Sequence, residues 1–155
     1  LVHFPAADPP FAVSLGPSGM LATGSAFELR TTVQFSTVGT FQVGIGIAPP
    51  SLTGPGLRCV VDGTFPSQQT LTLFDGDGIL ARTAVPVFVG VDQVIAFSFE
   101  RQGAMSALAC SVKDGTSAPI GITAVGPVVD DVTVQLVSTT AHTVFLSLTT
   151  VRLGP

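Results

Sequence analysis

The sequence contains no tryptophan, no tyrosine and no asparagine, and only 10% of its 155 residues are charged. Since 46% of the residues are hydrophobic, such a chain must cover its surface with Ser, Thr, Gly and Pro, or with copies of itself. The scarcity of asparagine, tyrosine and lysine also has a genomic explanation, because their codons are rich in A and T. The eleven phenylalanines and the missing tryptophan do not follow from a GC-rich genome.

Positive charge is sparse and scattered along the chain. The formal net charge is -4, and the isoelectric point is about 4.7. Nucleic-acid binding relies on clustered lysine and arginine, which release counterions from phosphates. We therefore predict no nucleic-acid partner. The six cations are Arg30, Arg58, Arg82, Arg101, Lys113 and Arg152.

Long hydrophobic runs are also missing, although the mean hydropathy is +0.61. The longest stretch of high hydropathy, residues 85–99, contains Pro86, Gly90, Asp92 and Gln93. A bilayer-spanning helix needs about 20 predominantly apolar residues, so we predict no membrane span. The chain starts at Leu1 without a visible signal peptide, and we expect a processed or trimmed product.

The length fits one domain with a sizeable core. Residues 1–24 are rich in proline and glycine and are predicted to form an arm lying over a single domain of residues 25–155. A disordered lead-in is the alternative for this arm.

Period-two alternation of apolar and polar residues dominates the chain, which is typical of strands with one buried face. Residues 27–35 and 41–47 both show it, and we expect them to form a hairpin. The same pattern predicts strands at 57–61, 70–74, 79–83, 85–89, 94–101, 108–112, 120–125, 132–138 and 143–153. Asp-Gly pairs predict a turn at residues 62–63, a hairpin at 75–78 and a turn at 114–115. We therefore predict an all-β antiparallel sandwich of about ten strands with no substantial helix.

Two cysteines, Cys59 and Cys110, fall on the apolar sides of their predicted strands. They form an inter-sheet disulfide if their Cα atoms lie within about 7 Å. The alternative is a pair of buried, inert thiols.

An aspartate-rich turn raises the question of a calcium site. The EF-hand pattern fails, because Pro86 stands where a bidentate glutamate is required. A surface Ca²⁺ site is the remaining candidate, and a plain hairpin turn is the default. The candidate ligands are Asp75, Asp77, Asp130 and Asp131.

No constellation of residues indicates catalysis or a bound cofactor. Only two glutamates are present, Glu28 and Glu100, and the two histidines, His3 and His142, lack metal-ligand spacing. Nucleotide-binding, nucleophile-elbow and CxxC motifs are absent. We expect the protein not to be an enzyme and to need no cofactor.

Four segments in order resemble the concanavalin A-like jelly roll, especially laminin G-like modules. The resemblance implies a jelly-roll sandwich from Phe27 to Leu153 and a carbohydrate-binding role. Asp92-Gln93 stands where such modules often carry a tryptophan, and viral and appendage jelly rolls share the same gross pattern. The four segments are a glycine-bearing strand at residues 41–47, the hairpin region 71–78, and a strand pair at 94–101 and 108–115 that ends in Asp-Gly.

Two functional hypotheses follow. The first is a non-catalytic structural or adhesive subunit of a virion, fibre or extracellular assembly, a homo-oligomer or a partner of other subunits. It rests on predicted outer faces that are small and neutral: Gln42, Gly44, Gly46, Ala107, Ala109, Ser111, Thr143, Phe145, Ser147 and Thr149.

The alternative is a lectin-like module that binds glycans. Sugar sites combine an aromatic platform with polar groups, and without Trp, Tyr or Asn this role falls to Phe, Gln and Asp. The candidate ligand loop is Phe65, Gln68, Gln69 and Phe74. Both hypotheses place the protein outside the cell, on a cell surface or on a virion surface.

Overall fold

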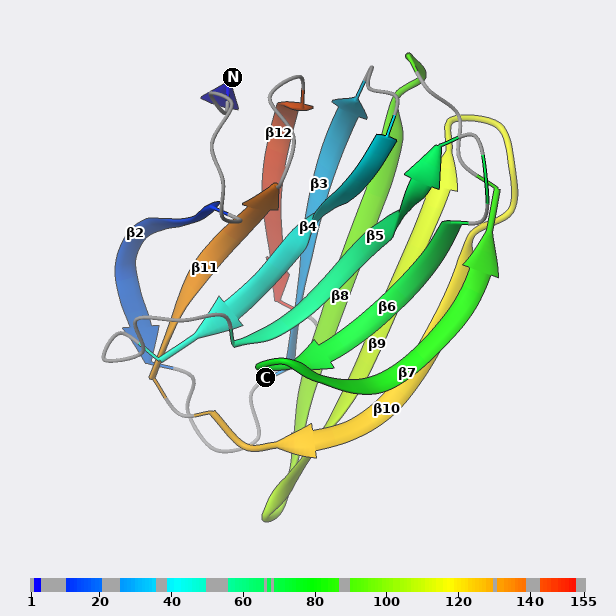
Figure 1. Ribbon diagram of the computed structural model, residues 1–155. Coiled ribbons are helices and arrows are strands. Elements are labelled where there is room, and N and C mark those ends of the chain that lie inside the picture. Colours follow the sequence, from blue (N-terminus) through cyan, green and yellow to red (C-terminus); the bar gives the residue numbers. More distant parts are fainter. Residues whose placement is uncertain are drawn as a thin grey trace.

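The protein is built from antiparallel strands packed as two layers (Figure 1). The computed structural model describes residues 2–3, 11–20, 26–35, 39–49, 56–65, 67, 69–86, 90–129, 131–138 and 143–152. In these ranges there is no helix, and hence none that could cross a membrane. The strands are β1 (Val2–His3), β2 (Phe11–Met20), β3 (Ala26–Phe35), β4 (Gly39–Ala48), β5 (Leu57–Phe65), β6 (Gln69–Asp75), β7 (Gly78–Val85), β8 (Gln93–Gln102), β9 (Met105–Asp114), β10 (Ile120–Pro127), β11 (Asp131–Ser138) and β12 (Thr143–Arg152).

Each layer is a six-stranded sheet. The back sheet has the order β1-β12-β3-β8-β9-β10, and the front sheet has the order β2-β11-β4-β5-β6-β7. All strand pairs are antiparallel, so the predicted all-β jelly-roll sandwich is confirmed.

The core lies between the sheets. Strands β8 and β9 of the back sheet fill it with every second residue, whereas β4 and β6 of the front sheet are buried on both faces over much of their length. Along β8, for example, Ile95, Phe97 and Phe99 are buried, whereas the residues between them are only half-buried. Phe99 stacks against Phe27 of β3, with the ring centroids 5.4 Å apart. In β8 and β9, the alternation seen in the sequence is therefore the alternation between core and surface.

A disulfide joins the two sheets through the middle of this core. Cys59 of β5 and Cys110 of β9 are bonded, with their Cα atoms 5.4 Å apart. Both residues are at most 1% exposed. The bond links strands that are 51 residues apart in sequence.

The first twenty residues contribute two edge strands, which raises the number of strands above the expected ten. Strand β1 pairs with β12, and β2 pairs with β11. Pro17 falls where the pairing between β2 and β11 shifts register, which is a position that a sheet edge tolerates. The proposed division between an arm and a domain at residues 24–25 stays a prediction.

The expected hairpin of residues 27–35 and 41–47 is wrong. Strand β3 pairs with β12 and β8 in the back sheet, whereas β4 pairs with β11 and β5 in the front sheet. Two amphipathic strands bury their apolar faces equally well side by side or across a core, and alternation alone does not distinguish these arrangements. Strands β3 and β4 therefore lie in different sheets.

Two of the three predicted Asp-Gly turns are confirmed. Residues 75–78 connect β6 and β7, with Gly76 in the left-handed region at φ +55°, and Asp114 ends β9. The turn at Asp62-Gly63 is wrong, because β5 continues through both residues to Phe65. Strand β7 ends at Val85, and residues 87–89 of the strand predicted there lie outside the described ranges.

Candidate functional site

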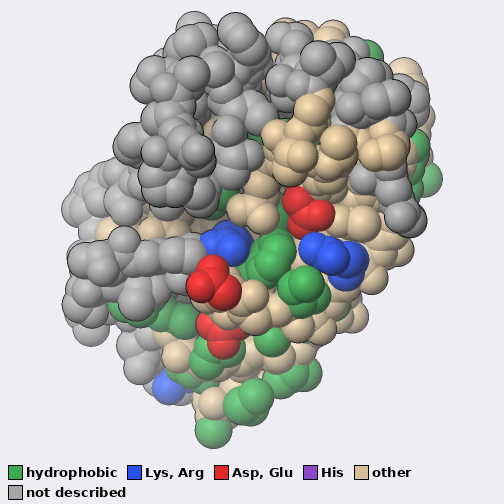
Figure 2. All heavy atoms as spheres, in the orientation of Figure 1, with side chains coloured by type: hydrophobic (Ala, Val, Ile, Leu, Met, Phe, Trp, Pro, Cys, Tyr) green, Lys and Arg blue, Asp and Glu red, His purple; other side chains and the backbone are tan. Residues whose placement is uncertain are grey.

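The outer face of the front sheet carries Arg58 and Asp62 on β5 and Arg82 on β7, with β6 between these two strands. Strand register places Asp62 beside Thr70, Thr72 beside Arg82, and Arg58 beside Phe74. These residues alternate with the buried core positions of β5, β6 and β7. Figure 2 views the molecule from this side and shows basic, acidic and hydrophobic side chains gathered at the centre of the face.

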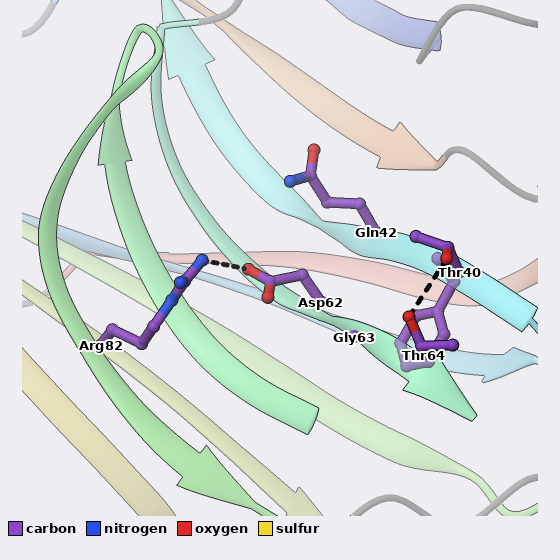
Figure 3. A pocket seen from close by; sticks show the side chains of 7 residues that line it. Thr40, Gln42, Asp62, Gly63, Thr64 and Arg82 are labelled. Atoms are coloured by element: carbon purple, nitrogen blue, oxygen red, sulfur yellow. Dashed lines mark hydrogen bonds and ion pairs between the residues drawn. The ribbon is translucent and has the colours of Figure 1, made fainter. Parts of the chain in front are cut away.

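An open hollow of about 540 Å³ lies at one end of this group (Figure 3). Strands β4, β5 and β7 supply its walls, so three strands of one rigid sheet fix its shape. Most of the lining residues are polar or charged: Thr40, Phe41, Gln42, Asp62, Gly63, Thr64 and Arg82.

An ion pair forms the polar wall of the hollow. Arg82 Nη2 lies 3.5 Å from Asp62 Oδ2. The hydroxyl of Thr70 donates to Asp62 Oδ1, and Arg82 Nε donates to the hydroxyl of Thr72 at 3.0 Å. Two threonines of the intervening strand β6 therefore orient both charged groups. Asp62 Oδ2 is buried and accepts no hydrogen bond in the described structure.

The opposite wall carries two hydroxyl groups. Those of Thr40 and Thr64 are exposed and lie 3.1 Å apart, since β4 and β5 place these residues side by side. Gln42 lies beside Asp62 in the same register. The hollow thus presents a carboxylate, a guanidinium, hydroxyls and an amide within one surface (Figure 3).

A second arginine lies at the other end of the face. The guanidinium of Arg58 lies over the ring of Phe74, 4.6 Å from its centroid, and both residues are 7% exposed. Burial lowers the pKa of Arg58, and the nearby charge of Asp77 partly opposes that effect. Phe74 is therefore covered by Arg58 and offers no open platform for a sugar ring.

Of the residues predicted as one ligand loop, Gln69 and Phe74 lie apart. Gln69 begins β6 and is buried, whereas Phe74 lies five residues along the same strand, about 17 Å away. Phe65 ends β5, and its side chain lies outside the described part, as does Gln68. Residues 69–74 form one extended strand rather than a loop, so Phe74 lies away from the β5–β6 turn, and a ligand site at that turn stays a prediction.

The candidate calcium ligands are also separated. Asp75 ends β6 and Asp77 lies in the following turn, whereas Asp131 begins β11. Strands β4 and β5 lie between β6 and β11, which corresponds to about 14 Å across the sheet. Asp130 lies outside the described residues. Within the described ranges, no three His, Cys, Asp or Glu residues are grouped to hold a metal ion.

A second hollow, of about 480 Å³, lies at the rim of the back sheet and includes Asp92 and Asp114. Asp114 Oδ1 accepts hydrogen bonds from the backbone N–H groups of Ser117 at 2.6 Å and Thr116 at 3.2 Å. The Ser117 and Thr116 hydrogen bonds lower the pKa of Asp114. These contacts close the turn after β9, so Asp114 has a structural role.

The sequence does not predict that Asp62 and Arg82 form a pair. Its pattern places Asp62 in a turn, and Arg82 is one of six cations scattered along the chain. The predicted hairpin at residues 75–78 is the sequence feature that places Arg82 on this face, because it aligns β6 with β7. Once the two strands are aligned, Thr72 and Arg82 fall on the face opposite the buried Leu71 and Leu73.

Comparison with known proteins identifies the fold but no family. No protein-family model matches the sequence, and no curated protein matches it either. The carbohydrate-binding module CBM66 from Bacillus subtilis matches at a TM-score of 0.62 and 15% identity, covering 94% of this chain and 83% of that one. Peanut lectin matches at 0.60 and 9% identity, covering 97% and 94%.

An enzyme shares the architecture as well. A polysaccharide lyase of family 18 matches at a TM-score of 0.51 and 11% identity, covering 85% of this chain and 74% of that one. The class that these likenesses define is the concanavalin A-like jelly-roll sandwich. The resemblance noted in the sequence is thereby confirmed at the level of the fold.

Proposed function

We propose that the protein is a non-catalytic carbohydrate-binding module whose site is the hollow around Asp62 and Arg82. The observation that carries the proposal is the preset ion pair, held by Thr70 and Thr72 and lining the open hollow. Sugar hydroxyls both donate and accept hydrogen bonds, so a carboxylate beside a guanidinium suits adjacent hydroxyls. The likeness to a carbohydrate-binding module and a lectin supports the same function.

The composition of the hollow favours binding without cleavage. Hydrolysis of a glycosidic bond ordinarily needs two carboxyl groups about 5–9.5 Å apart. Asp62 is the one carboxylate among the lining residues, and histidine is absent from them. The sequence also has no tyrosine to act as an acid or base. The likeness to a lyase makes polysaccharide cleavage the outcome to test against.

An extracellular or cell-surface location accompanies this function. Disulfides persist in oxidising compartments and are rare in the cytosol. The buried Cys59–Cys110 bond supports this location.

Assembly into a larger particle is the second candidate. Its support is the outer face of β8, β9 and β10, where Ala107, Ala109 and Ser111 are half-buried and Val125 is 61% exposed. None of the similar structures described above is named as a virion or fibre subunit. Sedimentation of the purified chain tests this candidate, because a monomer at high concentration would contradict it.

Glycan arrays followed by calorimetry test the binding function. We expect Asp62→Asn and Arg82→Gln to weaken binding at least about tenfold, because each removes a charged hydrogen-bonding group. Glu100→Gln and Lys113→Gln, which make the same charge changes on the back sheet, should leave affinity unchanged.

Two results would overturn the proposal. One is the absence of any glycan ligand for the unmodified chain, and the other is equal binding by the two pairs of variants. Shortening of the bound polysaccharide during the same incubations, abolished by Asp62→Asn, would indicate an enzyme instead.

A further inference from the structure

Arg58 is a buried cation without a close counterion. Its Nε is buried and has no hydrogen-bond partner. The nearest carboxylate oxygen, Asp77 Oδ1, lies 4.0 Å from Nη2, and the side chain of Asp77 is fully exposed. A charge-assisted hydrogen bond is about 2.7–2.9 Å long, so Asp77 attracts Arg58 without satisfying it.

The unsatisfied Nε lies on one edge of the guanidinium, beside Nη2. Nε and Nη2 form the side-on edge of the planar group, which matches the two oxygens of a carboxylate. The ring of Phe74 supports one face of the guanidinium, which holds the group flat. The edge is therefore fixed in direction and lacks its natural partner.

This arrangement is unfavourable in the unliganded protein. Burying a charge is costly unless it is paired and hydrogen-bonded. The lowered pKa of Arg58 has the same origin, because burial is its largest cause. A ligand that brings a carboxylate to the edge would offset the cost. The exposed Asp77 lies 4.0 Å from Nη2, so the Nη2 end of this edge lies beside solvent, whereas Nε is buried.

We propose that Arg58 binds a carboxylate of the ligand and that the glycan therefore contains a uronic acid unit. This inference rests on the proposed glycan site. Arg58 and Asp62 lie four residues apart on β5, about 13 Å along the strand. An oligosaccharide can span that length, whereas a single ring cannot. The acidic unit lies over Arg58, and neutral units place their hydroxyls in the hollow, where the Asp62 carboxylate would repel an anion.

Asp77 then acts as a weak internal competitor for the same edge. Removing the Asp77 carboxylate should strengthen binding of an external carboxylate. Replacing the guanidinium of Arg58, and with it the Nε–Nη2 edge, should weaken that binding. These opposite effects distinguish a carboxylate site from a guanidinium that only covers Phe74.

The test uses D-glucuronate as the probe, titrated at constant ionic strength and followed by the Nε–Hε resonance of Arg58 in NMR spectra. Glucuronic acid methyl ester and glucose 6-sulfate serve as the uncharged and the tetrahedral-anion comparators. We expect a saturable shift with glucuronate and none with the ester. A response to the sulfate equal to that of glucuronate, or to the ester, would overturn the assignment of a uronic acid.

Variants sharpen the test. Asp77→Asn should tighten glucuronate binding about two- to fivefold, the range expected for removing one exposed ion pair. Asp75→Asn, in the same turn, should change nothing. Arg58→Lys keeps the positive charge but removes the two parallel N–H donors of the guanidinium, and it should weaken glucuronate binding about tenfold or more. Thermal unfolding of each variant verifies that it folds.

The outcome separates this inference from the proposed function. Looser or unchanged binding by Asp77→Asn would refute the carboxylate site. Another outcome is that a neutral glycan binds through Asp62 and Arg82 while the Arg58 Nε–Hε resonance does not shift with glucuronate. In that case the proposed function stands, and only the assignment of a uronic acid unit is wrong. If the Arg58 resonance shifts with glucuronate but Asp62→Asn leaves glycan affinity unchanged, the assignment of the hollow as the glycan site is wrong instead.

Discussion

The disulfide between the two sheets gives the most quantitative prediction. We expect its reduction to lower the free energy of unfolding, because the bond restricts the unfolded chain. A loop closed between residues 51 apart loses about 14 cal/mol/K of entropy in the unfolded state, or about 4 kcal/mol at room temperature. That is a large part of the 5–15 kcal/mol typical of a folded domain.

Guanidinium chloride unfolding with and without a thiol reductant measures this effect. Far-UV circular dichroism is the suitable signal, because the sequence has neither tryptophan nor tyrosine. With a denaturant dependence of about 4 kcal/mol per molar, the midpoint should fall by about 1 M on reduction. The double variant Cys59→Ala/Cys110→Ala is the control, since its midpoint should not respond to the reductant.

Two observations would refute this reasoning. One is an unchanged midpoint in the reductant. The other is the detection of two free thiols in the denatured, unreduced protein, which would mean that the bond does not form. The second result would also remove the support that the disulfide gives to an extracellular location.

Three further predictions concern single residues. Gly44→Ala should destabilise the protein by about 1–3 kcal/mol in chemical unfolding, because its Cβ would lie 2.1 Å from a carbonyl oxygen of β5; Gly121→Ala, whose nearest atom is 3.4 Å away, should be tolerated. Asp114 has a lowered pKa and so stabilises the fold above about pH 4, the ordinary pKa of aspartate. That contribution is lost as the pH falls through the lowered value, so Asp114→Asn should flatten the acid limb of a stability–pH curve, and an unchanged limb would contradict it. Thr70→Val should weaken glycan binding about two- to tenfold in calorimetry by releasing Asp62, and unaltered affinity would show that Thr70 has no positioning role.

The strands were predictable because apolar and polar residues alternate along them in the sequence, most clearly in β8 and β9, where burial alternates as well. The alternation at residues 94–101 and 108–112 corresponds closely to β8 and β9, and the Asp-Gly-Asp-Gly turn identified the pairing of β6 with β7. Pairing across longer connections was not predictable. Strands β3 and β4 have the same alternation whether they share a sheet or face each other, so the hairpin expected there was wrong.

Register explains why the site was missed as well. Arg58 and Phe74 are sixteen positions apart in sequence and become neighbours only when β5 pairs with β6. Composition suggested that aromatic residues in a loop would contact a sugar. The structure instead covers Phe74 with a guanidinium and leaves the polar pair Asp62 and Arg82 facing the hollow.

The low charge of the chain makes the position of each cation informative. Arg58 and Arg82 are the two cations of the front sheet, since the other four lie on strands of the back sheet. Surface charge for solubility is best placed in water, yet Arg58 is 7% exposed. Burying the charge of Arg58 lowers the stability of the fold unless an anionic partner offsets the cost of desolvation. A chain that covers itself mainly with small neutral residues has no general need for such a group, and this favours a ligand as the partner of Arg58.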